Sequence, residues 1–427
     1  MPFVNTYWIF LSVATYVSSA QVEKVVYDGA QVWRTVLRSA ENVLLVKGLI
    51  DNQDVSIWSL SPTQADFLVR YEHKEMVNRM LSSQNINHTV LILDVQRSID
   101  AQPLTPSLWT ENSLKVGHRL DWHTFPTLSI IEEYFNFLAD DYSSMCKVQT
   151  IGYTSENRTI KMINVTNGNP DNEIIIVTGG THGRDWISVT SVLFILHTIV
   201  TEFDKQYSLQ NKNWLIVPVV NPDGYVYTHS SDRLWRKNRN KFKSCIGADI
   251  NRNFEIDWGV TGIADNNECK ETYSGPFPFS EAESLALRNI IKSSKAKPTA
   301  MVDIQAYGNL ILFPWSARTH VTKDVQLHKE TAKEMIRAIF QASKKKYIYG
   351  ATYHVAYPTS GTFLDWAYSN EVSHSYVLKT RDKGQLGFLV PPEEIEETGN
   401  ELFAAVHYLA KIVTRPSRQG NDSRTWF

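Results

Sequence analysis

From Leu120 onward, short apolar segments of strand character alternate with longer segments of helical spacing. The apolar stretch EIIIVTGG, residues 173–180, ends in a Gly-Gly turn, and a long apolar segment with helical spacing, residues 186–203, follows it. Near-continuous apolar strands between helices indicate a largely parallel sheet that is covered on both faces. Ligands bind such sheets at the carboxyl ends of the strands, so polar residues that follow a strand are the first candidates for a functional site.

A different pattern precedes this region. Between about residues 23 and 97, the periodicity predicts strand, helix, strand, strand, helix and strand. The segments are AQVWRTVL, SAENVLLVKGLID, VSIWSLS, ADFLVRY, KEMVNRMLSSQ and HTVLILDV. This order is that of a ferredoxin-like α+β sandwich, so residues 21–98 are predicted to form a small domain of their own.

The first twenty residues are apolar and end in Ser18-Ser19-Ala20, which is typical of a secretory signal peptide over residues 1–20. The chain is therefore expected to be secreted and extracellular. No later apolar run is expected to approach the ~20 residues that are needed to cross a bilayer. The formal net charge of −2 argues against nucleic acid or an anionic membrane as an obligatory partner. Sequons that suit a glycoprotein lie at Asn87, Asn157, Asn164 and Asn421.

Residues 99–119 contain proline and serine and read as a linker or activation segment, with Arg97, Lys115 and Arg119 as candidate protease sites. An ordinary ordered connection is an equally good interpretation. The main domain is then expected over residues 120–415, followed by a polar tail over residues 416–427. Cys146, Cys245 and Cys269 are the three cysteines, so in an oxidising compartment two should pair and one is left over.

Three motifs stand in one order along the second region: NPDGYVYTHSSDRLWRKNR at 221–239, ADINRNFEIDWG at 248–259 and LDWAY at 364–368. Together they resemble the zinc carboxypeptidases of the carboxypeptidase A/B family, and the resemblance covers nearly the whole chain after residue 20. It implies an α/β fold with a mixed, largely parallel eight-stranded sheet and helices on both faces, preceded by the ferredoxin-like pro-domain. It also implies a monomer.

The resemblance implies a set of residues that bind the carboxylate of a peptide C-terminus, and these residues are present. Asn251 and Arg252 fall on the carboxylate-binding pair, for which an arginine fork is suited. The other positions are the oxyanion-stabilising Arg236, the subsite residues Arg184 and Tyr307, and the mobile Tyr357. Cys245 and Cys269 match the family disulfide, which leaves Cys146 free or paired outside the chain.

The residues that match the zinc site and the catalytic base are mostly changed. The family holds zinc with the His and Glu of an HxxE motif and a later His, and a Glu activates the water. Here His182 is kept, but Asp185 replaces Glu, Gln305 replaces the later His, and Lys379 replaces the catalytic Glu. An amide oxygen suits harder cations than zinc, and a protonated lysine has no lone pair with which to act as a base.

Charge counting leads to a specific expectation for Lys379. The formal charges of Asp185 and Lys379 cancel when no metal is bound. A bound zinc ion would add an uncompensated charge of +2 beside Arg236 and Arg252. The Lys379 ammonium is therefore expected to occupy or border the metal position, paired with Asp185 and bonded to Gln305. Zinc, the cofactor that the resemblance implies, is expected to be weakly bound or absent.

Three possible functions follow. The first is a secreted pseudoenzyme that binds peptide or protein C-termini without efficient hydrolysis. The second is an active carboxypeptidase A-like metallo-exopeptidase that uses His182, Asp185 and Gln305. A third is a structural or decoy role. Leu364 and Val377 match specificity-pocket positions and favour an apolar or aromatic C-terminal residue, although these side chains could simply pack in the core.

Overall fold

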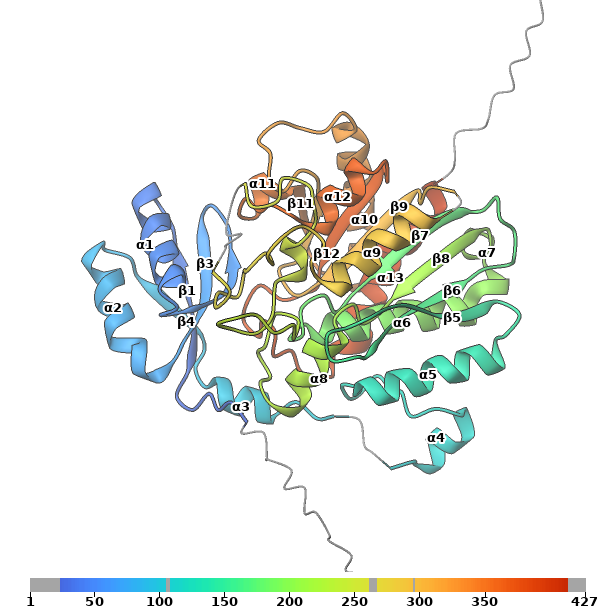
Figure 1. Ribbon diagram of the computed structural model, residues 1–427, viewed down its shortest axis with the longest axis horizontal. Helices are drawn as coiled ribbons and strands as arrows, with labels where there is room; N and C mark the ends of the chain where they lie inside the picture. The colour runs from blue at the N-terminus through green and yellow to red at the C-terminus, as the bar shows by residue number, and fades with distance from the viewer. Residues whose placement is uncertain (1–23, 105–107, 261–266, 295, 414–427) are drawn as a thin grey trace, which may run out of the picture.

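The computed structural model describes residues 24–104, 108–260, 267–294 and 296–413. The expected signal peptide, the expected C-terminal tail and the sequon at Asn421 lie outside the described residues. The described chain forms two domains, each with its own sheet. Figure 1 shows the N-terminal domain as a blue lobe at the left of the larger C-terminal domain.

The N-terminal domain has the predicted β-α-β-β-α-β order. Its elements are β1 (Gln31–Val36), α1 (Ala40–Asp51), β2 (Ser56–Leu60), β3 (Gln64–Val69), the 3₁₀ helix η1 (Tyr71–His73), α2 (Lys74–Ser83) and β4 (His88–Ile92). The strands pair in the order β2-β3-β1-β4, and every neighbouring pair is antiparallel. The Ser39 side chain caps α1 by accepting a hydrogen bond from the N–H of Asn42, as its place before an apolar helix predicts.

Both faces of this small sheet are buried, and each face packs against a different layer. Successive side chains of a strand point to opposite faces. Trp33 and Phe67 belong to the core shared with α1 and α2, whereas their neighbours Val32 and Leu68 belong to the core of the C-terminal domain. In Figure 1, α1 and α2 lie on the outer side of the sheet. The alternation therefore directs the sheet toward the C-terminal domain.

The C-terminal domain is built on a mixed eight-stranded sheet with the order β11-β10-β12-β9-β7-β8-β6-β5. Its strands are β5 (Cys146–Tyr153), β6 (Thr159–Val165), β7 (Glu173–Thr178), β8 (Lys212–Val217), β9 (Ala300–Gln305), β10 (Leu310–Phe313), β11 (Ile348–Ala351) and β12 (His374–Lys379). Strands β12, β9, β7 and β8 run parallel to one another, as β10 and β11 do. The remaining pairs are antiparallel. The expected largely parallel sheet with helices on both faces is confirmed.

Helices cover both faces of the sheet. They are α5 (Leu128–Asp141), α6 (Trp186–Glu202), η2 (Phe203–Lys205), α7 (Tyr207–Gln210), α8 (Pro222–Ser230), η3 (Ile250–Arg252), α9 (Ala282–Ser293), α10 (Val325–Ser343), α11 (Thr352–Val355), α12 (Phe363–Ser369) and α13 (Glu394–Ile412). In β7, Ile175 and Val177 join the core formed with α5, α6, α10 and α13, while Ile176 joins the core formed with α9 and α12. This two-sided burial explains the unbroken apolar sequence of the strand.

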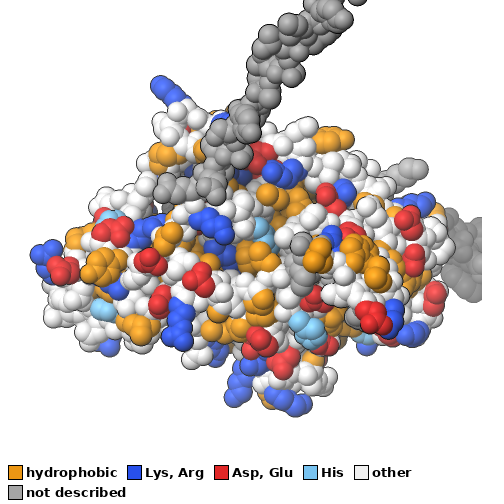
Figure 2. All heavy atoms as spheres, turned by 90° about the horizontal axis from the view of Figure 1, so that it is seen from below, with side chains coloured by type: hydrophobic (Ala, Val, Ile, Leu, Met, Phe, Trp, Pro, Cys, Tyr) orange, Lys and Arg blue, Asp and Glu red, His pale blue; other side chains and the backbone are white. Residues whose placement is uncertain are grey.

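Helix α6 is a core helix. The segment Trp186–Lys205 is long and apolar enough to cross a membrane, contrary to the expectation from the sequence, but most of it is buried inside the protein. A helix that is apolar on all sides is typical of the interior of a large domain. On the face in Figure 2, acidic and basic side chains are interspersed among scattered apolar ones, as on the surface of a globular protein.

The connection between the domains is partly ordered and contains α3 (Val95–Asp100) and α4 (Glu111–Val116). Gln102 is buried in the C-terminal domain, where its Nε2 donates to Val390 O at 2.8 Å and its Oε1 accepts from Arg233 Nε at 2.7 Å. Arg119 donates to Glu133 Oε2 from both Nε and Nη2, at 2.9 and 2.7 Å. Arg97 and Lys115 are exposed. Of the three candidate protease sites, Arg119 is thus in a partly buried ion pair, whereas the ion pair of Lys115 with Glu111 is exposed.

A buried carboxyl group in α9 makes the stability of this domain pH-dependent. Glu283 is 1% exposed. Asn238 donates to its Oε2, while its Oε1 has no hydrogen-bond partner among the described residues. Burial raises the pKa of Glu283 to about 7, although the hydrogen bond from Asn238 opposes the rise. The folded protein therefore holds a proton on Glu283 at pH values where the unfolded chain has lost it.

We expect this group to destabilise the fold as the pH rises from about 5 to about 8. Its folded-state pKa lies above the unfolded value, so the stability that protonation provides is lost over that range, by about 2 to 3 kcal/mol. Glu283→Gln removes the titration, so the stability gap between variant and unmodified protein should widen in favour of the variant. Urea unfolding at several pH values measures the gap. The exposed Glu330→Gln is the control. A gap that does not change with pH would contradict the prediction.

Candidate functional site

The candidate residues meet at the carboxyl edge of the sheet. His182 and Asp185 lie in the turn between β7 and α6, Gln305 ends β9, and Lys379 ends β12. Strands β9 and β12 are parallel neighbours, and Gln305 and Lys379 are paired in register. The three positions at which the sequence departs from the family pattern therefore lie together.

A fully buried carboxylate, Asp249, organises one side of the site. His182 Nε2 lies 3.1 Å from its Oδ1, and Arg236 donates to its Oδ2 from Nε at 3.1 Å and Nη2 at 2.7 Å. Arg252 Nη1 lies 3.8 Å from the same oxygen. Burial alone would raise the pKa of Asp249, but the charges of Arg236, Arg252 and His182 hold it well below its ordinary value. Asp249 is thus an anion that fixes three site residues.

Asp185 and Gln305 are bound to neighbouring groups of the protein. Asp185 Oδ2 accepts from the Ala306 N–H at 3.1 Å and lies 3.6 Å from His182 Nδ1, while its Oδ1 has no hydrogen-bond partner in the described part of the chain. The Gln305 amide donates to Asp303 Oδ2 at 2.6 Å, and burial raises the pKa of Asp303. Across the described ranges, no three His, Cys, Asp or Glu side chains are grouped as they would be to hold a metal ion.

Lys379 borders the site as expected, but the expected contacts are wrong. Within residues 24–413 as far as they are described, Lys379 makes no ion pair with Asp185 within 4.0 Å and no hydrogen bond to Gln305. Asp185 is instead bonded to Ala306, and Gln305 turns its amide group toward Asp303. Burial lowers the pKa of Lys379 to about 8, which Asp185 opposes and Arg236 and Arg252 reinforce. The ammonium is therefore a charge near Asp185 without a bonded carboxylate.

A cavity of about 170 Å³ joins most of these residues. Its lining includes Asn251, Arg252, Arg236, His182, Gln305, Lys379 and Tyr357. Its apolar part contains the predicted Leu364 and Val377, together with Leu310, Leu312 and Val355. The hydroxyl-bearing Ser316, Thr352, Thr359 and Thr362 line it as well. The cavity thus combines a cationic and an apolar part.

The N-terminal domain closes one side of this cavity, because β2 and the turn after it, residues 57–61, also line it. Two of the predicted subsite residues bind that domain rather than the cavity. Arg184 Nη2 donates to the backbone oxygen of Ile57 at 3.1 Å, and the Tyr307 hydroxyl donates to Asp66 Oδ2 at 3.0 Å. Asp66 is itself paired with Arg34, with two contacts of 2.6 Å.

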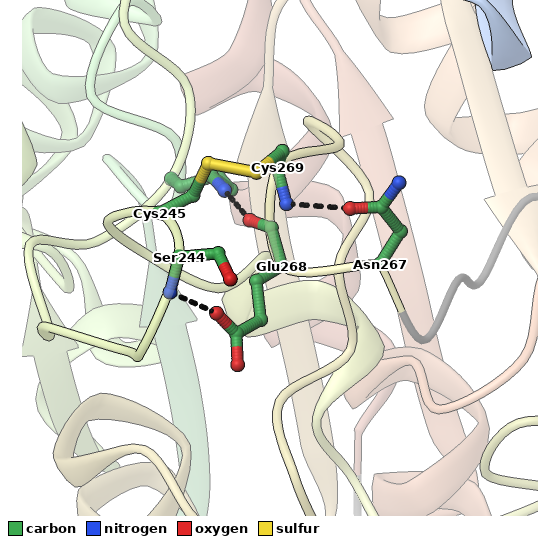
Figure 3. Close-up of a disulfide and its surroundings, with 6 residues drawn as sticks. Ser244, Cys245, Asn267, Glu268 and Cys269 are labelled. Carbon is green, nitrogen blue, oxygen red and sulfur yellow. Dashed lines mark hydrogen bonds between the residues drawn. A yellow bond between two sulfur atoms is a disulfide. The ribbon is translucent and has the colours of Figure 1, made fainter.

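The predicted disulfide is present. Cys245 and Cys269 are joined, and in Figure 3 the adjacent Glu268 carboxylate accepts the Ser244 N–H while Asn267 accepts the Cys269 N–H. The bond closes a loop beside Lys237, whose Nζ donates to Glu268 O at 2.7 Å. Cys146 is free and buried, and burial raises the pKa of its thiol to about 12. Its thiol is therefore poorly placed to pair with another chain.

Comparison with known proteins agrees with this geometry. A family model described as zinc carboxypeptidase matches residues 131–405, and a model described as carboxypeptidase activation peptide matches residues 33–102. The chain belongs to the zinc carboxypeptidase family. The N-terminal domain is accordingly a carboxypeptidase propeptide domain, as the resemblance implied.

The relatives of this chain match either both domains or the C-terminal domain alone. Carboxypeptidase B of Rattus norvegicus is 28% identical over 93% of this chain and 97% of its own length. Carboxypeptidase B of Astacus astacus is 33% identical over 69% of this chain and 98% of its own length. Among solved structures, carboxypeptidase A from Helicoverpa armigera has a TM-score of 0.82 at 26% identity, covering 90% of this chain and 98% of its own. Thrombin activatable fibrinolysis inhibitor has a TM-score of 0.81 at 25% identity, covering 91% and 99%.

Sequence reasoning missed several residues that shape the site. Asp249 stands within the motif ADINRN, and its signal was available: two arginines and a histidine placed in one buried site need a counter-charge. Asp303, two residues before Gln305 on β9, was also missed. The contributions of Leu310 and Leu312 carried no local signal, because an apolar residue in a strand looks the same whether it lines a cavity or the core.

We expect Asp249→Asn to destabilise the fold by roughly 3 kcal/mol or more, because it leaves Arg236 and Arg252 buried beside each other without their anion. Guanidinium unfolding of the full chain measures the loss. Asp257→Asn, which breaks the partly exposed pair with Arg318, is the matched control and should cost about 1 kcal/mol or less. Equal losses for the two variants would show that Asp249 does not organise the site.

Proposed function

We propose that this zinc carboxypeptidase homologue is a secreted, monomeric pseudoenzyme that binds the C-termini of peptides or proteins and does not hydrolyse them efficiently. The observation that carries the proposal is the Lys379 ammonium in the cavity, beside Asp185 and Gln305 and close to two arginines. An ammonium at this point removes the base and opposes a divalent cation.

The residues present do not fit zinc. A zinc site needs three good nitrogen, sulfur or carboxylate donors and an open position. Here the third candidate donor is the neutral amide of Gln305, and its neighbour Lys379 is a cation. One carboxylate oxygen of Asp185, Oδ2, is occupied by the Ala306 N–H and by His182, which leaves only Oδ1 for a metal. No step of hydrolysis is therefore derived through a metal in this chain.

The arrangement favours binding of a carboxylate by Asn251 and Arg252. The Asn251 Oδ1 accepts the Phe363 N–H at 2.9 Å, which leaves the amide NH₂ to donate to a ligand. The Arg252 Nε is buried and lacks a hydrogen-bond partner among the described residues. A carboxylate would satisfy both donors, because charge-assisted hydrogen bonds to a guanidinium are strong. Leu312, Leu364 and Val377 would then take an apolar or aromatic C-terminal side chain.

The N-terminal domain would have to move before a peptide could enter. Arg184, which holds the Ile57 carbonyl in this state, is the group best placed to hold a main-chain carbonyl of a bound peptide. A secreted protein is supported by the disulfide and by the exposed sequons at Asn87 and Asn157. Asn164, in contrast, is half-buried in β6.

One observation favours an active metallo-exopeptidase as the second candidate. His182 keeps its carboxylate partner Asp249 on Nε2, which is the usual support of a metal-binding histidine, and Asp185 keeps one unbonded buried oxygen. Such an enzyme would release apolar or aromatic C-terminal residues. Metal content separates the two candidates.

We expect the full chain to retain less than about one tenth of a zinc ion per chain after exposure to micromolar zinc and dialysis, because its donor set is incomplete. The triple variant Asp185→Glu, Gln305→His, Lys379→Glu restores the family donors and should retain about one. Elemental mass spectrometry measures both proteins. One zinc per unmodified chain would reject the pseudoenzyme and make hydrolysis of an apolar C-terminal residue the next assay.

We expect the chain nicked at the exposed Arg97 by limited trypsin digestion to bind a fluorescent peptide with an apolar C-terminal residue. The free acid should bind at least tenfold more tightly than its C-terminal amide, because the amide cannot accept the charged bonds. Arg252→Gln should cost roughly thirtyfold in affinity, as removal of a buried charge partner does. The exposed Arg337→Gln is the control, and fluorescence polarisation measures all of them. Equal affinity for the free acid and the amide would contradict binding of the C-terminal carboxylate by Asn251 and Arg252.

A further inference from the structure

The charges that line the cavity are of one sign. Arg236, Arg252 and Lys379 present their cationic groups to it, whereas none of its described lining residues is an aspartate or a glutamate. The nearby acids lie behind the surface: Asp249 and Asp185 are each at most 1% exposed. A ligand in the cavity therefore meets three cations directly.

These cations are unequally compensated. Asp249 serves both arginines, with a close double contact to Arg236 and a longer one to Arg252. Lys379 has no carboxylate within 4.0 Å among the residues that the structure describes, and its nearest acid, Asp185, is bonded elsewhere. One C-terminal carboxylate on Asn251 and Arg252 would still leave Lys379 without a counter-charge. Buried charge of this kind favours a ligand that carries a second anionic group.

The layout of the cavity limits where that second group can be. If the C-terminal carboxylate lies on Arg252 and the last side chain in the apolar part at Leu364 and Val377, the main chain must leave past the remaining polar groups. Lys379 and Arg236 are the cations among these groups, which also include His182, Gln305 and several hydroxyl-bearing side chains. Lys379 lies two residues beyond Val377 on β12 and on the same face of the strand, so the residue that precedes the last one is placed beside the lysine ammonium.

We propose that this protein selects C-termini with an aspartate or glutamate at the penultimate position followed by an apolar last residue, and that Lys379 binds the penultimate carboxylate. This proposal rests on the proposed binding of C-termini. A basic penultimate residue is excluded by repulsion from Lys379 and Arg236, and a neutral one leaves Lys379 uncompensated. The lysine that removes hydrolysis thus becomes the residue that determines specificity.

The test uses the chain nicked at Arg97 and four peptides of one length that differ only at their ends. Three are free acids ending in Glu-Leu, Gln-Leu and Lys-Leu, and the fourth is the Glu-Leu amide. We expect Glu-Leu to bind about tenfold more tightly than Gln-Leu, the fold-change of one charge-assisted hydrogen bond, and Lys-Leu to bind more weakly than either. The Glu-over-Gln preference should shrink as sodium chloride is raised from 50 to 500 mM.

Lys379→Gln should abolish the Glu-over-Gln preference while the preference for free acid over amide remains. Lys237→Gln is the matched control: it removes a lysine charge beside the disulfide, outside the lining of this cavity, and should leave the preference intact. Thermal melting checks that both variants fold. If Lys379→Gln does not fold, the peptide preference and its salt dependence in the unmodified chain still decide the proposal.

The outcomes separate the two proposals. Equal affinity for Glu-Leu and Gln-Leu, with the amide still discriminated against, would overturn the selection of acidic penultimate residues and leave C-terminal binding standing. A preference that survives Lys379→Gln would overturn the role of Lys379. Failure of all three free acids to bind more tightly than the amide would overturn the binding of C-termini itself. Succinate that competes as strongly as Glu-Leu would assign the cavity to small dicarboxylates instead of peptides.

Discussion

The buried Asp249 carboxylate is the constraint on which the site depends. His182, Arg236 and Arg252 come from three separate segments of the chain, and each contacts this one anion. Two arginines buried side by side repel each other, so their positions are tolerable only because the carboxylate lies between them. The cationic surface of the cavity is therefore preorganised before any ligand arrives, which lowers the entropy lost on binding.

The two domains share more than a covalent link. The sheet of the N-terminal domain buries one face on its own helices and the other on the C-terminal domain, so its alternating side chains contribute to two cores. Its strand β2 also lines the cavity, and Arg184 and Tyr307 hold it there. Gln102 anchors the connection between the domains through Val390 and Arg233. The propeptide domain thus contributes lining residues to the cavity and also covers one side of it.

The fold followed from sequence periodicity and resemblance because burial on two faces leaves a readable pattern. The strand 173–178 has an apolar side chain at nearly every position, and the N-terminal domain shows the period of two that a sheet between two layers requires. Strands β5, β10 and β11 were not foreseen. The mixture of exposed and half-buried residues in β5 and β11 resembles a loop, and β10 has only four residues, too few for a recognisable period.

Sequence reasoning named residues that line one cavity, but it did not predict the contacts between them. Asn251, Arg252, Leu364 and Val377, which were chosen from motif matches, line this cavity, and their roles there stay predictions. The pairing of Lys379 with Asp185 was wrong, because counting formal charges ignores the backbone N–H of Ala306, which competes for the same carboxylate. Tyr307 was expected at a subsite, but its hydroxyl binds Asp66 of the N-terminal domain. Contacts of this kind join residues hundreds of positions apart and leave no local trace in the sequence.

Gln305 and Lys379 are direct neighbours across the β9–β12 ladder, and this register has a consequence for how the chain can change. Substitutions at residues in contact do not add, so the effect of altering either one depends on the identity of the other. A glutamate at 379 alone would stand near Asp185 and Asp303 with no metal to hold, and a histidine at 305 alone would face an ammonium. Each single reversion is thus worse than either end state. A chain with the family's zinc donors and this chain are therefore connected only by coordinated substitutions at both positions.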